Sequence, residues 1–112
     1  MDKKHKEADE KYKKGKACIK TSLFKWSPDY LGASLYFEEA AKLYKGCGNQ
    51  VMAKDSFIKY AEASEKQDSV SCAANGYTEA AFLEPSFERS EELLQKAMEM
   101  YQIDGKAERG VM

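Results

Sequence analysis

Apolar residues recur every three or four positions along most of the chain, which is the spacing of one face of an α-helix. Together with turn and capping residues, this spacing predicts five helices, over about residues 2–22, 28–45, 50–66, 69–84 and 86–103. Asp104 and Gly105 predict a stop, and the residues from 106 onward resemble the opening of a sixth helix. No stretch shows the period-two alternation that predicts strands. The pattern therefore indicates an all-α chain.

Each predicted helix carries its own set of apolar and small residues that we expect to be buried. The five sets are Ala8, Tyr12, Gly15, Ile19 and Ser22; Ala33, Phe37, Ala40, Ala41 and Tyr44; Ala53, Phe57, Tyr60, Ala61 and Ser64; Val70, Ala73, Ala74, Tyr77, Ala80 and Ala81; and Phe87, Ser90, Leu94, Ala97 and Tyr101. Ser27 is a good capping residue, and Pro28 suits the first position of the second helix. Gly46 and Gly48 predict the turn that follows this helix.

The helices also repeat. Residues 37–41 (Phe-Glu-Glu-Ala-Ala) resemble residues 77–81, and residues 57–61 resemble residues 93–97. Paired helices with a period near 34–40 residues, with alanine at close contacts and Tyr or Phe between them, are typical of tetratricopeptide-like repeats. Such hairpins bury their apolar faces by stacking. We therefore expect stacked antiparallel helical hairpins, an α-solenoid sheet, forming a single domain over residues 1–112.

Charge is unevenly distributed along the 112 residues, whose net charge is −1. Residues 1–25 contain nine lysines and four acidic residues, a net charge of +5, so the remainder carries −6. A basic arm on an acidic body suggests an anionic partner, such as lipid headgroups, an acidic protein surface or nucleic acid. The alternative is a solvated helix face with no partner, and charge by itself favours that alternative.

Residues typical of catalysis or metal binding are sparse. The single histidine, His5, lies among lysines with no ligand or base at motif spacing, so we expect a surface residue. Cys18 and Cys72 are expected to be core thiols and Cys47 a turn residue; their odd number and wide spacing favour reduced thiols in the cytosol. Neither a phosphate-binding loop nor a zinc motif is present. We predict a binding module with no enzymatic activity, metal or cofactor.

One short segment, Leu23-Phe24-Lys25-Trp26, places large apolar side chains beside lysines just before Pro28. Exposed aromatic residues in a loop are unfavourable unless something covers them. They could fold back as a plug over the junction of the first two helices. Alternatively, they could enter a membrane interface, where apolar rings meet lipid and cations meet headgroups. Lys20 and Lys25 favour the membrane contact.

These residues resemble the N-terminal region of a known family, the soluble NSF-attachment proteins, nearest the gamma type. The resemblance is carried by Leu23-Phe24-Lys25-Trp26-Ser27-Pro28-Asp29-Tyr30, Ala33, Tyr36, Ala40-Ala41, Tyr44-Lys45, Ala53-Lys54-Asp55, Ala73-Ala74, Tyr77, Ala80, Gln95-Lys96-Ala97-Met98-Glu99-Met100-Tyr101 and Gly105. It extends over essentially the whole chain. The aromatic segment is its specific part, since the Ala and Tyr positions would suit many tetratricopeptide-like proteins.

The resemblance implies an adaptor in vesicle trafficking. Family members lie along the four-helix SNARE bundle, touch the membrane through the loop between the first two helices, and present C-terminal helices to the AAA ATPase NSF. Mapped onto this chain, the membrane contact is Leu23, Phe24, Lys25 and Trp26 with Lys20, and candidate SNARE contacts are Lys45, Lys54 and Lys59. The resemblance also implies a cytoplasmic protein that is peripheral on the cytosolic face of membranes.

Two departures from the family qualify this expectation. Relatives are longer, and their NSF-facing part has no counterpart here, so we interpret the chain as an N-terminal fragment or as a very short relative. Alpha-type relatives carry lysines at the end of the fourth helix, where this chain has Leu83-Glu84, which predicts weaker SNARE binding.

A generic tetratricopeptide-like module that binds a peptide tail is the alternative function. Nucleic-acid binding is not expected, because aromatic residues should then be interleaved with the lysines. In residues 1–22 the one aromatic residue of this kind is Tyr12.

Overall fold

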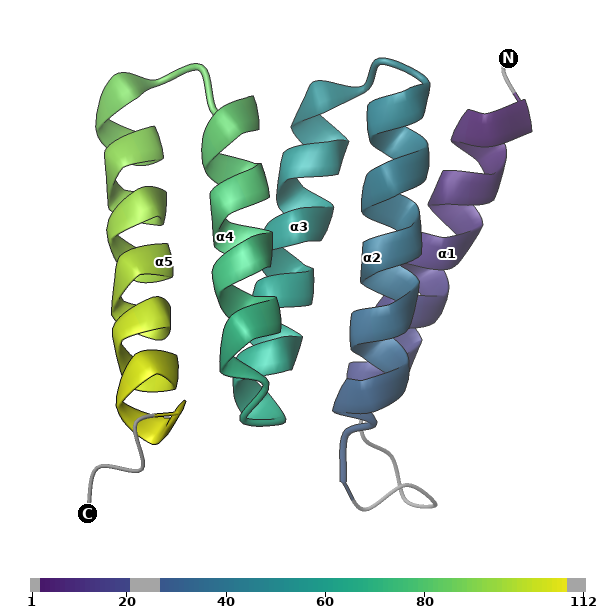
Figure 1. Ribbon diagram of the computed structural model, residues 1–112. Coiled ribbons are helices and arrows are strands. Elements are labelled where there is room, and N and C mark those ends of the chain that lie inside the picture. The colour runs from purple at the N-terminus through teal and green to yellow at the C-terminus, as the bar shows by residue number, and fades with distance from the viewer. Residues whose placement is uncertain (1–2, 21–26, 109–112) are drawn as a thin grey trace.

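The computed structural model contains five helices, and it describes residues 3–20 and 27–108, with side chains as far as Ile103. The helices are α1 (Lys3–Ile19), α2 (Tyr30–Gly46), α3 (Gln50–Lys66), α4 (Val70–Leu83) and α5 (Phe87–Glu108). Figure 1 shows them in this order across the molecule. No strand occurs in these two segments. The predicted all-α class is therefore confirmed.

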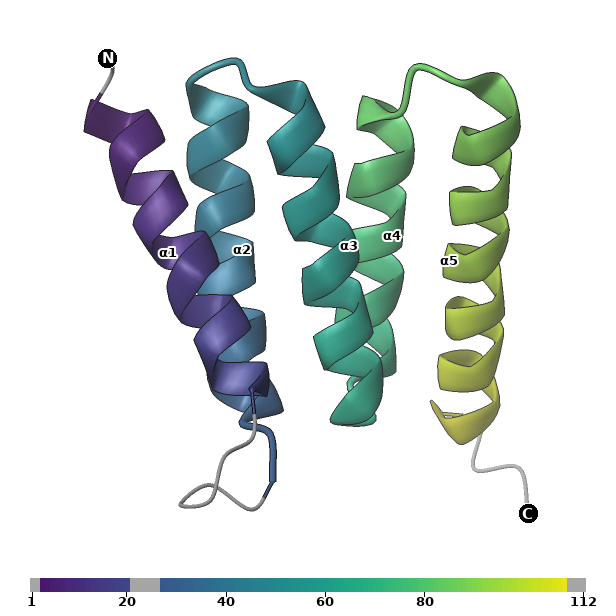
Figure 2. The ribbon, with the colours of Figure 1, turned by 180° about the vertical axis from the view of Figure 1, so that it is seen from behind.

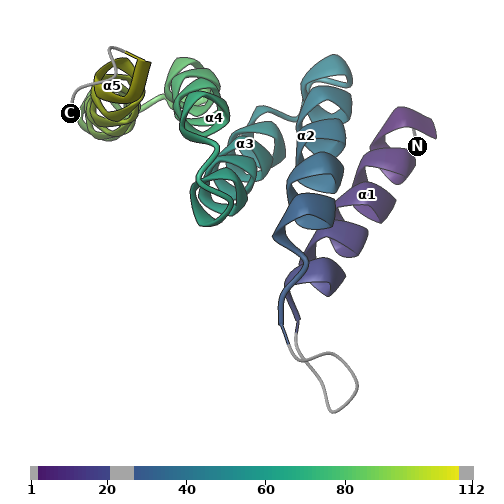
Figure 3. The same ribbon diagram turned by 60° about the horizontal axis from the view of Figure 1, so that its bottom comes forward.

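Successive helices run antiparallel and pack against each other in chain order. In Figures 1 and 2, α1 and α3 lie on one side of the molecule, and α2 and α4 lie on the other. Figure 3, in which the lower ends of the helices are turned towards the viewer, shows the resulting zigzag. The molecule measures 51 × 41 × 19 Å, and the smallest dimension is close to two helix diameters. This arrangement is the predicted stack of helical hairpins.

The core is built mainly by α2, α3 and α4, whose predicted buried faces are confirmed except for the partly exposed Val70. Phe37, Tyr44 and Tyr77 are the largest side chains that are fully buried. Alanines fill the positions between these rings, among them Ala40 and Ala80, which are equivalent in the two repeats. Small residues allow helix backbones to approach closely, and the rings fill the spaces that remain.

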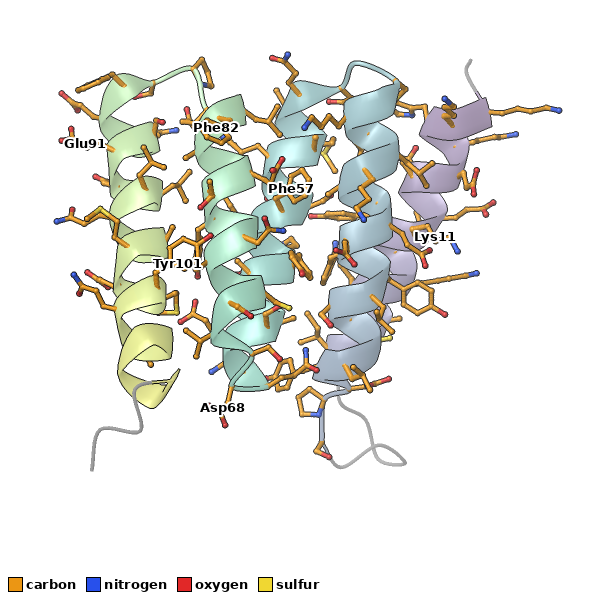
Figure 4. All side chains as sticks on the ribbon, viewed as in Figure 1. Lys11, Phe57, Asp68, Phe82, Glu91 and Tyr101 are labelled. Atoms are coloured by element: carbon orange, nitrogen blue, oxygen red, sulfur yellow. The ribbon has the colours of Figure 1, made fainter. Side chains whose placement is uncertain are left out.

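The buried face predicted for α5 is wrong at three positions. Phe87, Leu94 and Tyr101 are 80%, 37% and 51% exposed, and Figure 4 shows Tyr101 on this helix. Ala97 is buried as predicted, and Leu93 packs against the core in place of Leu94. Among the described helices α5 contacts mainly α4, so one narrow stripe of its surface is covered. Two neighbouring stripes of α5 are apolar, and the sequence pattern alone does not show which of them will be buried against α4.

Two predicted helix ends are also wrong. The residue that caps α2 is Asp29, not Ser27, because the Asp29 carboxylate accepts a hydrogen bond of 2.9 Å from the Gly32 amide. Pro28 therefore precedes the helix rather than starting it. At the other end of the chain, α5 continues through Asp104 and Gly105 as far as Glu108, so the predicted stop is wrong and residues 106–108 belong to α5 rather than to a sixth helix; residues 109–112 lie outside the described residues. A glycine inside a helix costs only about 1 kcal/mol, which neighbouring turns can offset.

The turns after α2 and α3 share one geometry. Gly48 has φ +85° and Asp68 has φ +59°, and each directly follows the C-cap residue of the preceding helix. The amides of Asn49 and Ser69 then bond back to helix carbonyls at 2.9 Å, the pattern of a Schellman motif. Asp68, at the turn between α3 and α4 in Figure 4, adopts a conformation that glycine prefers and aspartate tolerates.

Two glycines mark the closest helix contacts. A Cβ atom on Gly15 of α1 would lie 2.9 Å from the Phe37 ring. A Cβ atom on Gly76 of α4 would lie 2.9 Å from both the Ala61 Cβ and the Phe57 carbonyl oxygen of α3. Separations below 3.0 Å require atoms to shift, and backbone shifts with difficulty. The α3–α4 contact therefore depends on glycine at position 76.

We predict that Gly76→Ala lowers the free energy of unfolding by about 1–3 kcal/mol, because overpacking outweighs alanine's better helix propensity. Gly46→Ala is the matched control, since nothing lies within 4 Å of a Cβ at Gly46. Urea denaturation followed by circular dichroism measures both. Equal stability of the two variants would contradict the close α3–α4 contact.

Candidate functional site

The predicted membrane loop lies between α1 and α2. Leu23, Phe24, Lys25 and Trp26 fall outside the described residues, so the structure places only the ends of this segment. Lys20 is exposed at the end of α1. The Asp29 amide donates a hydrogen bond of 2.8 Å to the Cys18 carbonyl, which holds the two ends of the loop together.

A groove between α1 and α3 is bordered by lysines. The lysines are Lys13, Lys16, Lys20 and Lys59, and the apolar residues of the groove are Ala17, Ile19 and Phe37. We call this feature the lysine groove. Its volume is about 560 Å³, and its lining contains four ammonium groups and no carboxylate. Figure 2 views the side of the molecule on which α1 and α3 lie.

A second hollow adjoins the lysine groove and shares Ile19 and Lys59 with it. Its volume is about 580 Å³, and its other lining residues are Tyr30, Glu62, Ala63, Glu65, Lys66, Tyr77 and Lys96. The Lys96 ammonium lies 5.3 Å from the centre of the Tyr77 ring, within range of a cation–π contact. Positive side chains thus continue from α1 across α3 towards α5, but in this hollow they alternate with two acidic residues.

Three tyrosines bind carboxylates of neighbouring helices. The hydroxyl groups of Tyr12, Tyr44 and Tyr77 donate hydrogen bonds to Asp55, Asp9 and Glu65, respectively. Burial first, and then the bonded carboxylate, raises the pKa of each tyrosine above its ordinary value. The hydroxyl groups therefore stay protonated and act as donors. One consequence is that Asp55, one turn before Lys59 on α3, is held by Tyr12.

The three lysines predicted to contact a partner do not share one face. The Lys45 ammonium lies 3.3 Å from the Glu79 carboxylate, which joins α2 to α4. Lys54 lies 2.7 Å from Glu84, whose side chain is 5% exposed. Lys59 lies on the other side, in the lysine groove, and no ion pair joins it to any carboxylate placed by the structure. The structure thus separates Lys59 from the other two.

Predictions for the histidine and one cysteine are wrong. His5 is half-buried: its Nε2 atom lies 3.1 Å from the side-chain Nδ2 of Asn49, and its ring packs edge-on against Tyr44. The turn between α2 and α3 places Asn49 beside His5 of α1. These residues are far apart in the sequence, so the sequence pattern could not show this contact. Cys72 is exposed rather than in the core, whereas Cys47 lies in the predicted turn and Cys18 is half-buried.

Lys13 and Lys16 were not singled out from the sequence. The signal is present, because residues 13, 16 and 20 are three and four positions apart and therefore share a helix face. That face is the one turned towards Lys59. A search for lysines at helical spacing would have found this half of the groove, but only the fold brings Lys59 to it.

The model of the family described as soluble NSF attachment protein, SNAP, matches residues 1–111 of the chain. The chain belongs to the SNAP family. The match confirms the resemblance stated from the sequence at the level of the family, while the gamma type remains a prediction. Within the described part of this SNAP chain, no helix combines the length and apolar character needed to span a bilayer.

In this SNAP chain the pair of Lys54 and Glu84 gives a pH-dependent contribution to stability. The Lys54 ammonium, and then the Ser86 amide, lower the pKa of Glu84 below its ordinary value. A carboxyl group with a lower pKa in the folded state stabilises that state when ionised. The stabilisation is present above the unfolded-state pKa and is lost as pH falls through the folded-state pKa.

We predict that Glu84→Gln lowers the free energy of unfolding at pH 7, and that this difference from the parent shrinks as pH falls below about 4. Glu91→Gln, at an exposed position of α5 labelled in Figure 4, is the control and should show no such loss. Urea midpoints between pH 3 and pH 7 measure the effect. A Glu84→Gln variant with the parent's stability at pH 7 would contradict a structural role for Lys54.

Proposed function

We propose that this SNAP-family chain is an adaptor that binds assembled SNARE complexes and the membrane surface in vesicle trafficking, in a pathway that recruits the NSF ATPase. The family match supports the adaptor class. The observation that carries the proposal is the run of lysines from α1 to α3 that no carboxylate of the lysine groove neutralises. A surface of this kind suits an acidic, elongated partner, because charge complementarity directs association and orientation.

Lys59 is the central SNARE-contact residue in this proposal. It borders both hollows, so a rod-like helical bundle lying across α1 and α3 would pass over it. Lys45 and Lys54 contribute less, because each is already paired with a carboxylate and would have to exchange that partner. Lys66 extends the basic surface along α3.

The membrane contact in the proposal is the loop of Leu23, Phe24, Lys25 and Trp26, with Lys20 at its base. The hydrogen bond between Asp29 and Cys18 supports it, because it fixes where the loop leaves and rejoins the helices. Transfer of an apolar side chain into the lipid interface contributes roughly 1.5–3 kcal/mol when burial is complete. The proposed site of action is the cytosolic face of membranes, where anionic lipids attract the neighbouring lysines.

We expect that Lys59→Glu combined with Lys66→Glu weakens binding of an assembled SNARE complex by about tenfold or more, since charge reversal opposes an acidic partner. The control is Lys6→Glu with Lys42→Glu, which makes the same charge change at positions that border neither hollow. Pull-downs at several salt concentrations measure both variants. Equal losses would assign binding to overall charge, and binding of a peptide tail in place of the complex would favour the generic repeat module.

We expect that Phe24→Ser combined with Trp26→Ser abolishes co-flotation with anionic liposomes while the helical circular dichroism spectrum is kept. The control is Phe82→Ser, because Phe82 is an exposed aromatic residue on α4, at the end of the helical layer opposite to the C-terminal end of α1. If the double variant unfolds and the control does not, the loop is a structural plug. Undiminished flotation of a folded double variant would remove the loop from the membrane contact.

A further inference from the structure

The lysine groove concentrates positive charge from two helices. Lys13, Lys16 and Lys20 lie on one face of α1, and Lys59 faces them from α3. Four ammonium groups around one groove repel one another, so a bound anion relieves the repulsion. The Lys16 ammonium also packs 5.7 Å from the Tyr12 ring, which limits its freedom to turn away.

The surroundings confine a small anion to this groove. The adjoining hollow contains Glu62 and Glu65, which repel negative charge, whereas the lysine groove has no carboxylate in its lining. Asp55, one turn before Lys59 on α3, accepts a hydrogen bond from Tyr12. The anion is therefore favoured more strongly at the α1 end of the face than beyond Lys59, where glutamates lie among the lysines.

The dimensions of the groove suit a compact ligand with several charges. Its volume of about 560 Å³ lies within the range of roughly 300–1,000 Å³ found for small-molecule sites. Phe37, Ile19 and Ala17 give it an apolar floor, and a low-dielectric wall strengthens the field of nearby charges. Lysine acts as a point charge that binds phosphate from many directions. A ring that carries several phosphates can reach lysines on both sides of the groove at once.

We propose that the lysine groove binds an inositol polyphosphate, either free or as the headgroup of a phosphoinositide lipid. The groove ends at Lys20, beside the loop proposed to touch the membrane, so a lipid headgroup could reach it. The site is independent of SNARE binding and would stand if that function failed. Where both occur, Lys59 is common to them, and the phosphate ligand competes with the acidic protein partner.

The first test titrates the full chain with inositol hexakisphosphate by isothermal calorimetry. The site variant is Lys13→Gln with Lys20→Gln and Lys59→Gln, and the control is Lys6→Gln with Lys14→Gln and Lys42→Gln, which has the same net charge. We expect the site variant to lose affinity at least tenfold more than the control, and all affinities to fall with salt. Thermal unfolding confirms that both variants are folded. No binding by the parent chain, or equal losses in the two variants, would overturn the proposal.

The second test distinguishes the two sources of the ligand. Flotation compares vesicles containing phosphatidylinositol 4,5-bisphosphate with phosphatidylserine vesicles of equal net charge. Preference for the phosphoinositide vesicles, lost in the site variant, assigns the lipid headgroup. Binding of the soluble probe without that preference assigns a free inositol polyphosphate. SNARE pull-downs are scored separately, so a parent chain that binds the soluble probe but no SNARE complex contradicts only the adaptor function.

Discussion

The contact between the Phe37 ring and the bare backbone at Gly15 sets the position of α1 against the rest of the molecule. Phe37 is fully buried, and any side chain at position 15 would collide with its ring. Tyr12 packs edge-on against the same ring at 5.6 Å between centroids. Phe37 also lines the floor of the lysine groove. The packing that holds α1 in place therefore also sets the distance between the lysines of α1 and Lys59.

Hydrogen bonds from tyrosine to carboxylate reinforce this packing and shape the charge of the surface. The bond from Tyr12 to Asp55 joins α1 to α3, which are not neighbours in the chain, and the bond from Tyr77 to Glu65 joins α4 to α3. A buried hydroxyl needs a partner, and a carboxylate is a strong one. Each bond also fixes the position of a negative charge beside a helix junction. The carboxylate that accepts the bond is then less available to pair with a lysine.

The sequence predicted the parts of the fold that depend on local pattern. The faces of α2, α3 and α4 could be found because each helix is covered on two sides, which requires a wide apolar stripe. The face of α5 could not, because Leu93 and Leu94 are equally apolar and only one of them meets α4. Ion pairs such as Lys54 with Glu84 join residues thirty positions apart. Only the fold shows which lysines are paired with a carboxylate.

The chain's net charge of −1 conceals a division between the two sides of the helical layer. On the side of α2 and α4, Lys42 and Lys45 pair with Glu38 and Glu79, so the charges largely cancel locally. On the side of α1 and α3, the lysine groove contains no carboxylate in its lining. Surface ion pairs contribute little to stability, but a lysine that is paired with a carboxylate is less available to bind an anionic partner. The two lysines of α2 therefore belong to a nearly neutral side, whereas the four lysines of the groove attract anions, and this division follows from which carboxylates lie beside each group.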